Sequence, residues 1–190
     1  MQTREQLKEK VAADLFWEAA QSGKGLYALV YEHPATAYLS PRHRAILFGD
    51  TSADTVRISG IKGEIDVPIV NAEVTHIEVS HTQAMRITKH GTACVLHGTE
   101  GKVTLDNGVL APPRRLHISP EHAKAYGFTD GQQIWVRIES EARSLTYGNV
   151  IVSIGETICP TLYLDQDETA AAGLTEGQSV RLLPTLEEGT

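Results

Sequence analysis

The stretch Leu39–Ala45, LSPRHRA, returns later in the chain at Ile118–Ala123 as ISPEHA. A serine followed by a proline is typical of a helix start, because the hydroxyl caps free backbone amides and the proline fits the first helical position. Val56–Ile58 returns about eighty positions later as Val136–Ile138, with the same residues VRI. The repeat therefore predicts two similar halves, each with a strand that leads into a short capped helix.

Outside these helix starts the sequence consists of short β-rich runs separated by turn residues, such as Leu26–Tyr31 and Val150–Ile154. Asp106–Gly108, DNG, predicts a hairpin between Val103–Leu105 and Val109–Leu110, because Asn and Gly tolerate the positive φ of a tight turn. The pattern favours a mainly β protein with short α-helices, built as two tandem pseudo-symmetric β-barrel domains.

Residues 5–20 form an amphipathic pattern that predicts a helix, and the glycines up to Gly25 predict its end and a hinge. Its apolar stripe consists of Leu7, Val11, Leu15 and Ala19, with Ala12, Phe16 and Ala20 beside it. Two alternatives remain open at this point: the helix lies on the core of its own domain, or it is a docking peptide for a partner surface. The predicted segments are residues 1–25, a helix and linker, and the repeats 26–92 and 93–190, with strand exchange between them.

The 190 residues carry a formal net charge of −7, from 17 Lys and Arg against 24 Asp and Glu. No long basic run exists, so we expect no nucleic-acid partner. No apolar run reaches the roughly 18–20 residues of a membrane span, so we expect a soluble, cytoplasmic protein without a membrane partner. Cys94 and Cys159 match no metal or disulfide spacing and are expected to be buried apolar side chains.

Three stretches, Gly98–Leu105, Arg115–Glu121 and Leu162–Ala170, resemble the propanediol-utilisation (PduL-type) phosphotransacylases, also called phosphate propanoyltransferases. The similarity runs from about Leu26 to about Leu183 in one register. It implies two β-barrel domains, two zinc ions between them, and exchange of an acyl group between coenzyme A and phosphate. It also implies a bacterial microcompartment location, with the leading helix as an encapsulation peptide for shell or core proteins, and a homodimer.

The resemblance also indicates where the zinc ligands of the family would lie. Four of its five histidine positions hold other residues here, namely Thr36, Tyr38, Arg115 and Tyr163. His117 is retained, and Asp54 is the candidate for the carboxylate ligand. A guanidinium at a ligand position would place a positive charge beside Zn²⁺, so we expect no zinc site.

These substitutions predict a metal-free polar pocket that contains Thr36, Tyr38, Arg115, His117 and Tyr163. A guanidinium binds phosphate in a two-pronged way without a metal, so the expected ligands are phosphate, an acyl phosphate or the pyrophosphate of coenzyme A. Arg114 is either a surface charge or part of the same anion clamp. Three functions remain open: an acyltransferase of altered mechanism, a non-catalytic binding protein, and an assembly component of a microcompartment.

Overall fold

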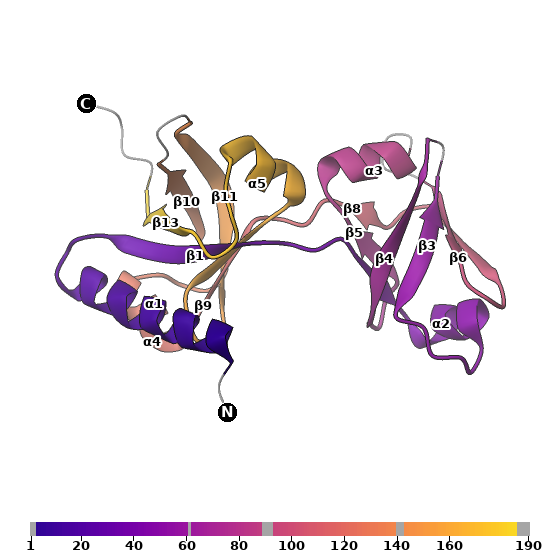
Figure 1. The fold of residues 1–190 in the computed structure, drawn as a ribbon, viewed down its shortest axis with the longest axis horizontal. Helices are drawn as coiled ribbons and strands as arrows, with labels where there is room; N and C mark the ends of the chain where they lie inside the picture. Colours follow the sequence, from indigo (N-terminus) through magenta and orange to yellow (C-terminus); the bar gives the residue numbers. More distant parts are fainter. Residues whose placement is uncertain (1–2, 61, 89–92, 140–142, 186–190) are drawn as a thin grey trace. The chain divides into compact units, whose positions relative to one another are not determined.

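The computed structural model describes residues 3–60, 62–88, 93–139 and 143–185, which fall into two compact units (Figure 1). Described residues within Met1–Glu32, Pro113–Leu164 and Glu168–Thr190 form the first unit, and those within His33–Pro112 and Asp165–Asp167 form the second. The two compact units therefore have other boundaries along the chain than the two predicted sequence repeats. The predicted boundary at residue 92 lies outside the described residues.

The first unit is a closed barrel of six strands in the order β1-β12-β9-β11-β10-β13. Its elements are α1 (Arg4–Gln21), β1 (Leu26–Glu32), β9 (Arg115–Ile118), α4 (Pro120–Tyr126), β10 (Gln133–Ile138), β11 (Leu145–Ile154), β12 (Thr161–Leu164), α5 (Gln166–Ala172) and β13 (Ser179–Leu183). Strand β1 pairs in parallel with β12 and antiparallel with β13, so a segment from the start of the chain closes a barrel made of late strands. This pairing explains why the compact units differ from the sequence halves.

Alternation along each strand separates the barrel core from its outer face. On β9, Leu116 and Ile118 are fully buried, whereas Arg115 and His117, which alternate with them, are exposed. The core also contains Val136, Val152 and Leu162, from three other strands. The apolar residues of β9 therefore hold the barrel together, and its polar residues lie on the outer face.

The second unit is a curled sheet of seven strands in the order β7-β6-β3-β4-β2-β5-β8. Its elements are β2 (Thr36–Leu39), α2 (Pro41–Phe48), β3 (Thr55–Ser59), β4 (Glu64–Asn71), β5 (His76–Glu78), α3 (His81–Ile87), β6 (Cys94–His97), β7 (Lys102–Leu105) and β8 (Val109–Leu110). The predicted mainly β fold, with barrel-like units and an N-terminal helix, is confirmed.

The hairpin predicted at Asp106–Gly108 is wrong. The chain does turn there, but β7 pairs with β6, and β8 pairs in parallel with β5. The carbonyl of Gly108 accepts a hydrogen bond from the amide of Ile77, which ties the turn to β5. The two flanking strands consequently stand at opposite ends of the strand order, because pairing with distant strands outweighs the local turn preference.

The two Ser-Pro helix starts are confirmed. The hydroxyls of Ser40 and Ser119 accept hydrogen bonds from the amides of His43 and His122, at the starts of α2 and α4. The repeat diverges in what each histidine then contacts. His43 Nδ1 lies 2.8 Å from the hydroxyl of Thr75, whereas His122 is buried and its Nε2 lies 3.3 Å from the carbonyl oxygen of α1 residue Ala13.

Helix α1 begins with a capping box between Thr3 and Gln6 and packs on the outside of the barrel. The buried side chains are Ala13 and Phe16, and the Phe16 ring stacks on Tyr27 of β1 at 5.9 Å. The Trp17 ring meets His122 of α4 edge-on at 5.4 Å. These contacts correspond to the first of the two alternatives, a helix that lies on its own domain.

None of the helices in the described part of the chain combines the length and the hydropathy that a membrane crossing requires.

Substitution of Phe16 by alanine tests the packing of α1 on the barrel. We expect Phe16→Ala to lower the free energy of unfolding of the barrel unit by about 3 kcal/mol, since the ring is buried against β1. Leu15→Ala is the matched control on the same helix, because Leu15 is 58% exposed, and its effect should stay within about 0.5 kcal/mol. Urea titration followed by circular dichroism measures both values. Equal effects of the two substitutions would contradict the packing of α1 described here.

Candidate functional site

Three of the predicted site residues lie together on the outer face of the barrel, on the neighbouring strands β9 and β12. Arg115 and His117 are two positions apart on β9, so their side chains leave the strand on the same side. Tyr163 pairs with Arg115 across the strands, and its ring meets that of His117 edge-on at 5.1 Å. The barrel thus presents a guanidinium, an imidazole and a phenol on one surface.

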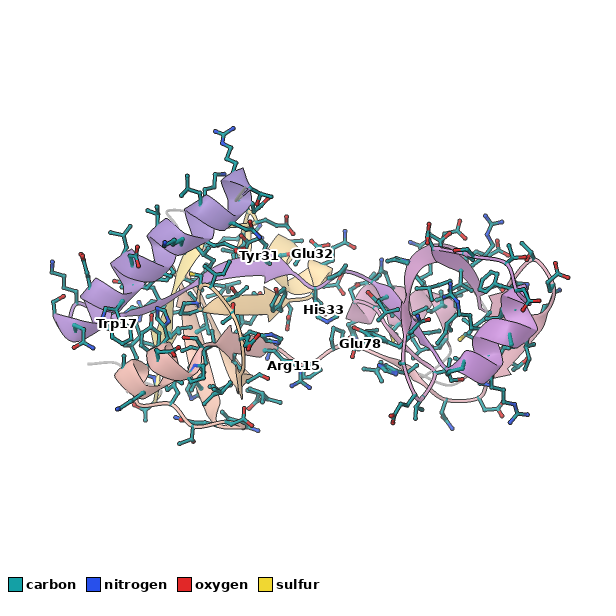
Figure 2. The ribbon with its side chains drawn as sticks, turned by 90° about the horizontal axis from the view of Figure 1, so that it is seen from below. Trp17, Tyr31, Glu32, His33, Glu78 and Arg115 are labelled. Carbon is teal, nitrogen blue, oxygen red and sulfur yellow. The ribbon has the colours of Figure 1, made fainter. Side chains whose placement is uncertain are left out.

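Arg115 is exposed and has neither an ion-pair nor a hydrogen-bond partner among the residues that the structure describes (Figure 2). The adjacent Arg114 is fully engaged. Its Nε donates to Glu168 at 2.5 Å, its Nη1 donates to the carbonyl of Gly148 at 2.8 Å, and its guanidinium lies 4.9 Å from the centre of the Tyr147 ring. Arg114 therefore stabilises the barrel, and Arg115 is the arginine whose charge is available to a ligand.

An acidic side chain borders this surface on the side of α1. Tyr31 of β1 pairs with Tyr163, and its hydroxyl donates to the Glu9 carboxylate at 3.4 Å. Burial, followed by the charge of Glu9, raises the pKa of Tyr31 to about 12. The same two causes raise the pKa of Tyr163. Both phenols are therefore protonated at neutral pH, and Tyr163 can donate a hydrogen bond from this surface.

Two further predicted residues, Thr36 and Tyr38, lie on β2 of the second unit. The hydroxyl of Thr36 donates to the carbonyl of Pro34 at 3.0 Å, and this side chain is buried. The ring of Tyr38 stacks on that of His76 at 4.4 Å. Burial, and then the nearby Glu78 carboxylate, raise the pKa of Tyr38. Both residues thus belong to a polar cluster formed by β2 and β5.

Glu78 is the centre of that cluster, and sequence reasoning missed it. His33 Nε2 lies 3.2 Å from one carboxylate oxygen of Glu78, and His76 Nε2 lies 3.8 Å from the other. His76 and Glu78 are two positions apart on one strand, a spacing that places both side chains on one face. The sequence could have indicated the His76–Glu78 pair by this spacing. It could not indicate Tyr38, because the pairing of β5 with β2 that places Tyr38 beside His76 is non-local.

The five predicted residues thus form two groups, one in each unit. Arg115, His117 and Tyr163 meet in the first unit, and Thr36 and Tyr38 are neighbours in the second. That all five share one cavity stays a prediction. Asp54, the predicted carboxylate ligand, is an exposed residue in the loop before β3, and its backbone carbonyl accepts a hydrogen bond from Ile69.

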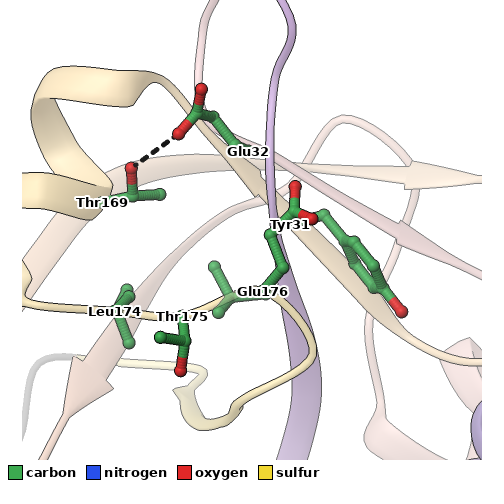
Figure 3. Close-up of a pocket in the computed structure, with 7 residues that line it drawn as sticks. Tyr31, Glu32, Thr169, Leu174, Thr175 and Glu176 are labelled. Atoms are coloured by element: carbon green, nitrogen blue, oxygen red, sulfur yellow. Dashed lines mark hydrogen bonds between the residues drawn. The ribbon is translucent and has the colours of Figure 1, made fainter.

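Two hollows of the barrel unit lie away from the Arg115 surface. A cavity of about 30 Å³ lies beside β1, where Thr169 donates to Glu32 at 3.4 Å (Figure 3). It has room for about one water molecule. A wider hollow of about 570 Å³ is lined in part by the acidic residues Glu121 and Glu156. Two like charges there disfavour a phosphate group, so the chemistry, rather than the volume, directs attention to Arg115.

Comparison with known proteins gives a consistent result. Residues 45–175 match the family model of phosphate propanoyltransferase. The phosphate propanoyltransferase of Shewanella putrefaciens is 32% identical over 69% of this chain and 69% of its own length. The phosphate propanoyltransferase of Thermotoga maritima is 31% identical over 68% of this chain and 69% of its own length. That of Leptotrichia buccalis is 29% identical over 93% of both chains.

The chain belongs to the phosphate propanoyltransferase family. The match of the family model includes β9 and β12, and therefore the strands that carry Arg115, His117 and Tyr163. Thr36 and Tyr38 precede the matched residues. The family match thus covers the barrel surface described above.

The zinc ions that the resemblance to phosphate propanoyltransferases implies do not fit the side chains present. Zinc takes thiolate, neutral imidazole or carboxylate ligands. Arg115 offers no acceptor, and the phenols of Tyr163 and Tyr38 are not among these ligands. Within residues 3–60, 62–88, 93–139 and 143–185, no group of three or more His, Cys, Asp or Glu could hold a metal ion. The donors around His117 suit an anion instead.

The coupling of Tyr31 to Glu9 can be measured by titration. We expect Tyr31 to ionise near pH 12, and Glu9→Gln to lower that pKa because the carboxylate charge is removed. Since the folded pKa exceeds the ordinary value of 10.0, this phenol contributes stability that is complete below pH 10 and is lost as the pH rises toward 12. Ultraviolet difference titration of the wild type against Tyr31→Phe reports the ionisation.

Glu18→Gln on the same helix is the control, because Glu18 is not among the charges that act on Tyr31. An unchanged Tyr31 titration in Glu9→Gln would show that the two side chains are not coupled.

Proposed function

We propose that this member of the phosphate propanoyltransferase family binds the phosphate-bearing compounds of propanoyl transfer without zinc, through Arg115 with His117 and Tyr163. The observation that carries the proposal is the position of Arg115, an exposed guanidinium with no partner among the described residues. It lies on the same surface as His117 and Tyr163. A guanidinium binds two phosphate oxygens at once, and His117 and Tyr163 supply further N–H and O–H groups. Phosphate, an acyl phosphate and coenzyme A share the required chemistry.

A second candidate function is the transfer itself. In that reaction a phosphate oxygen attacks the thioester carbonyl, the carbon–sulfur bond breaks, and the thiolate of coenzyme A takes up a proton. A cation beside two donors could position the attacking phosphate and stabilise the negative charge on the carbonyl oxygen. The grouping of Arg115, His117 and Tyr163 on one surface favours this candidate, whereas the loss of the metal ligands favours binding alone.

Removal of the guanidinium tests the binding proposal. We expect Arg115→Ala to weaken the binding of coenzyme A roughly 10- to 100-fold, since a hydrogen bond to a charged group contributes about 1.5–3 kcal/mol. Arg137→Ala is the matched control, because Arg137 is an exposed arginine of the same barrel that is paired with Glu139. Isothermal titration calorimetry with coenzyme A and with inorganic phosphate gives both affinities. Equal binding by Arg115→Ala and the wild type would refute the proposal.

Release of free thiol separates binding from turnover. We would incubate the wild type with propanoyl-coenzyme A and phosphate and determine the thiol formed together with the zinc content of the protein. Binding without thiol release identifies a non-catalytic protein, and release by a zinc-free protein that Arg115→Ala abolishes identifies the altered mechanism. Release that requires stoichiometric zinc would overturn the proposal.

We also propose, on the resemblance, that the chain works in the cytoplasm inside a bacterial microcompartment, where shell or core proteins are its partners. In support, α1 has apolar side chains that its own barrel leaves uncovered. A fluorescent fusion of the full chain is expected to co-localise with shell proteins in cells that form microcompartments. Diffuse fluorescence in those cells, with shells present, would contradict this location.

A further inference from the structure

A serine and a histidine meet on the outer face of the second unit, on the neighbouring strands β3 and β6. The hydroxyl of Ser59 lies 2.5 Å from Nε2 of His97. Ile58 of β3 and Leu96 of β6 point into the core and are fully buried. Ser59 and His97, each one position further along, are therefore half-buried on the outer face. A hydroxyl and an imidazole within hydrogen-bond distance are the two parts of an activated nucleophile.

Two other hydroxyl–imidazole pairs in the described residues belong to helix caps. His122 Nδ1 lies 3.0 Å from the hydroxyl of Ser119, the N-cap of α4, and both side chains are buried. His43 Nδ1 bonds to Thr75, whose hydroxyl also accepts from the amide of Ser40, the N-cap of α2. The pair on β3 and β6 caps no helix, and its hydroxyl has no second hydrogen-bond partner within the part of the chain that the structure describes.

Ser59 also lines a hollow of about 240 Å³. The other lining residues have small or apolar side chains, namely Gly60, Ala93, Cys94 and Val95. This volume is below the roughly 300–1,000 Å³ of a site for a drug-sized ligand, so the hollow suits a short chain of atoms. No charged side chain is among these lining residues, so the hollow favours an uncharged group.

Cys94 is the other nucleophile beside the hollow, and its surroundings make it unreactive. Its side chain belongs to the core of the second unit and is 2% exposed. Burial raises the pKa of the Cys94 thiol to about 11, so this thiol keeps its proton at neutral pH. The hydroxyl of Ser59, which has a base within hydrogen-bond distance, is therefore the group that attacks.

We propose that Ser59 and His97 form a second reactive site, which takes the acyl group from uncharged carboxylic esters with a short acyl chain. The Ser59 oxygen attacks the ester carbonyl while its proton passes to Nε2 of His97. The bond between the acyl carbon and the ester oxygen breaks, and the leaving alcohol takes the proton from His97. Water then attacks the acyl-serine by the same route, which releases the carboxylic acid and restores the hydroxyl. The reaction needs no phosphate, so it is independent of the site proposed around Arg115.

The surroundings of His97 set the pace of this reaction. Among the described residues His97 takes part in no ion pair. Its cross-strand neighbour Arg57 holds the carboxylate of Asp66 by two hydrogen bonds, of 2.9 and 3.0 Å. An acidic partner on the second ring nitrogen would orient the imidazole and stabilise its protonated form. Without one the activation of water is slow, so the acyl group accumulates on Ser59.

Burst kinetics with p-nitrophenyl acetate test the site in the full chain. We expect a rapid release of about one equivalent of p-nitrophenol per chain, followed by slow steady release, because the acyl-serine forms faster than it is hydrolysed. Peptide mass spectrometry of the quenched wild type should locate the acetyl group on Ser59. Acetyl groups found only elsewhere, on lysines, Thr75 or Cys94, would overturn the proposal without any variant.

Substitutions separate a reactive pair from a merely structural hydrogen bond. Ser59→Ala should abolish the rapid phase, and Ser59→Cys should retain it, since a thiol beside His97 is still a nucleophile. His97→Gln should slow the rapid phase roughly 100-fold, because an amide can form a hydrogen bond but cannot take up the proton. His43→Gln is the matched control, because it removes an imidazole that bonds to a hydroxyl at a helix cap.

Circular dichroism verifies the fold of each variant. A rapid phase that persists unchanged in His97→Gln would refute the role of His97 as the base, and so would one that disappears in His43→Gln.

The hollow is tested separately from the reactive pair. Val95→Trp should fill it and slow acylation at least tenfold, although Ser59 and His97 are both present. The wild type should likewise react at least tenfold more slowly with p-nitrophenyl octanoate than with the acetate, because the longer acyl chain exceeds the available volume. Equal rates for the two esters, or no effect of Val95→Trp, would contradict the assignment of this hollow to the acyl group.

Discussion

The pairing of β1 with two other strands is the interaction on which the barrel unit depends. β1 is bonded along one edge to β12 in parallel and along the other to β13 antiparallel, and with it the six strands close. Closure buries Ala28 and Val30 inside and leaves Tyr27, Leu29 and Tyr31 outside, where α1 packs. β1 comes before both Ser-Pro helix starts in the sequence. It nevertheless completes the core of the barrel and its outer surface, which the later strands form with it.

That outer surface has two chemically different parts. Toward α1 it is apolar, with Phe16 and Leu29 in one cluster with Cys159. Burial there raises the pKa of the Cys159 thiol to about 12, so this cysteine is protonated and unreactive at neutral pH. Toward β9 the surface is polar, with Arg115 exposed. The helix covers the first part and leaves the second accessible.

Local signals in the sequence predict the elements well, and non-local contacts account for what they miss. The Ser-Pro caps and the helix from Arg4 depend on interactions within a few residues, and the sequence predicts them. Asp106–Gly108 favours a hairpin locally, but β8 pairs with β5, which only the folded chain decides. Likewise the sequence predicts Leu7, Val11 and Leu15 as the apolar stripe of α1, but these side chains are exposed, and the buried face is the one whose Phe16 ring stacks on Tyr27. The contact of Glu78 with His33 is non-local in the same way, because it joins β5 to the segment between β1 and β2.

The alternation within β9 and β12 separates the barrel core from the polar side chains of the outer face. Leu116 and Leu162 point into the barrel and are fully buried, whereas Arg115 and Tyr163, one position away, point outward. A change of an outward side chain on these strands removes no core contact, so it costs the barrel little stability. It does change the electrostatic preference of the surface, because a fixed cation such as Arg115 repels Zn²⁺ and attracts phosphate. The core and the site are thus independent on the same strand, and the site can acquire a new ligand preference without a new fold.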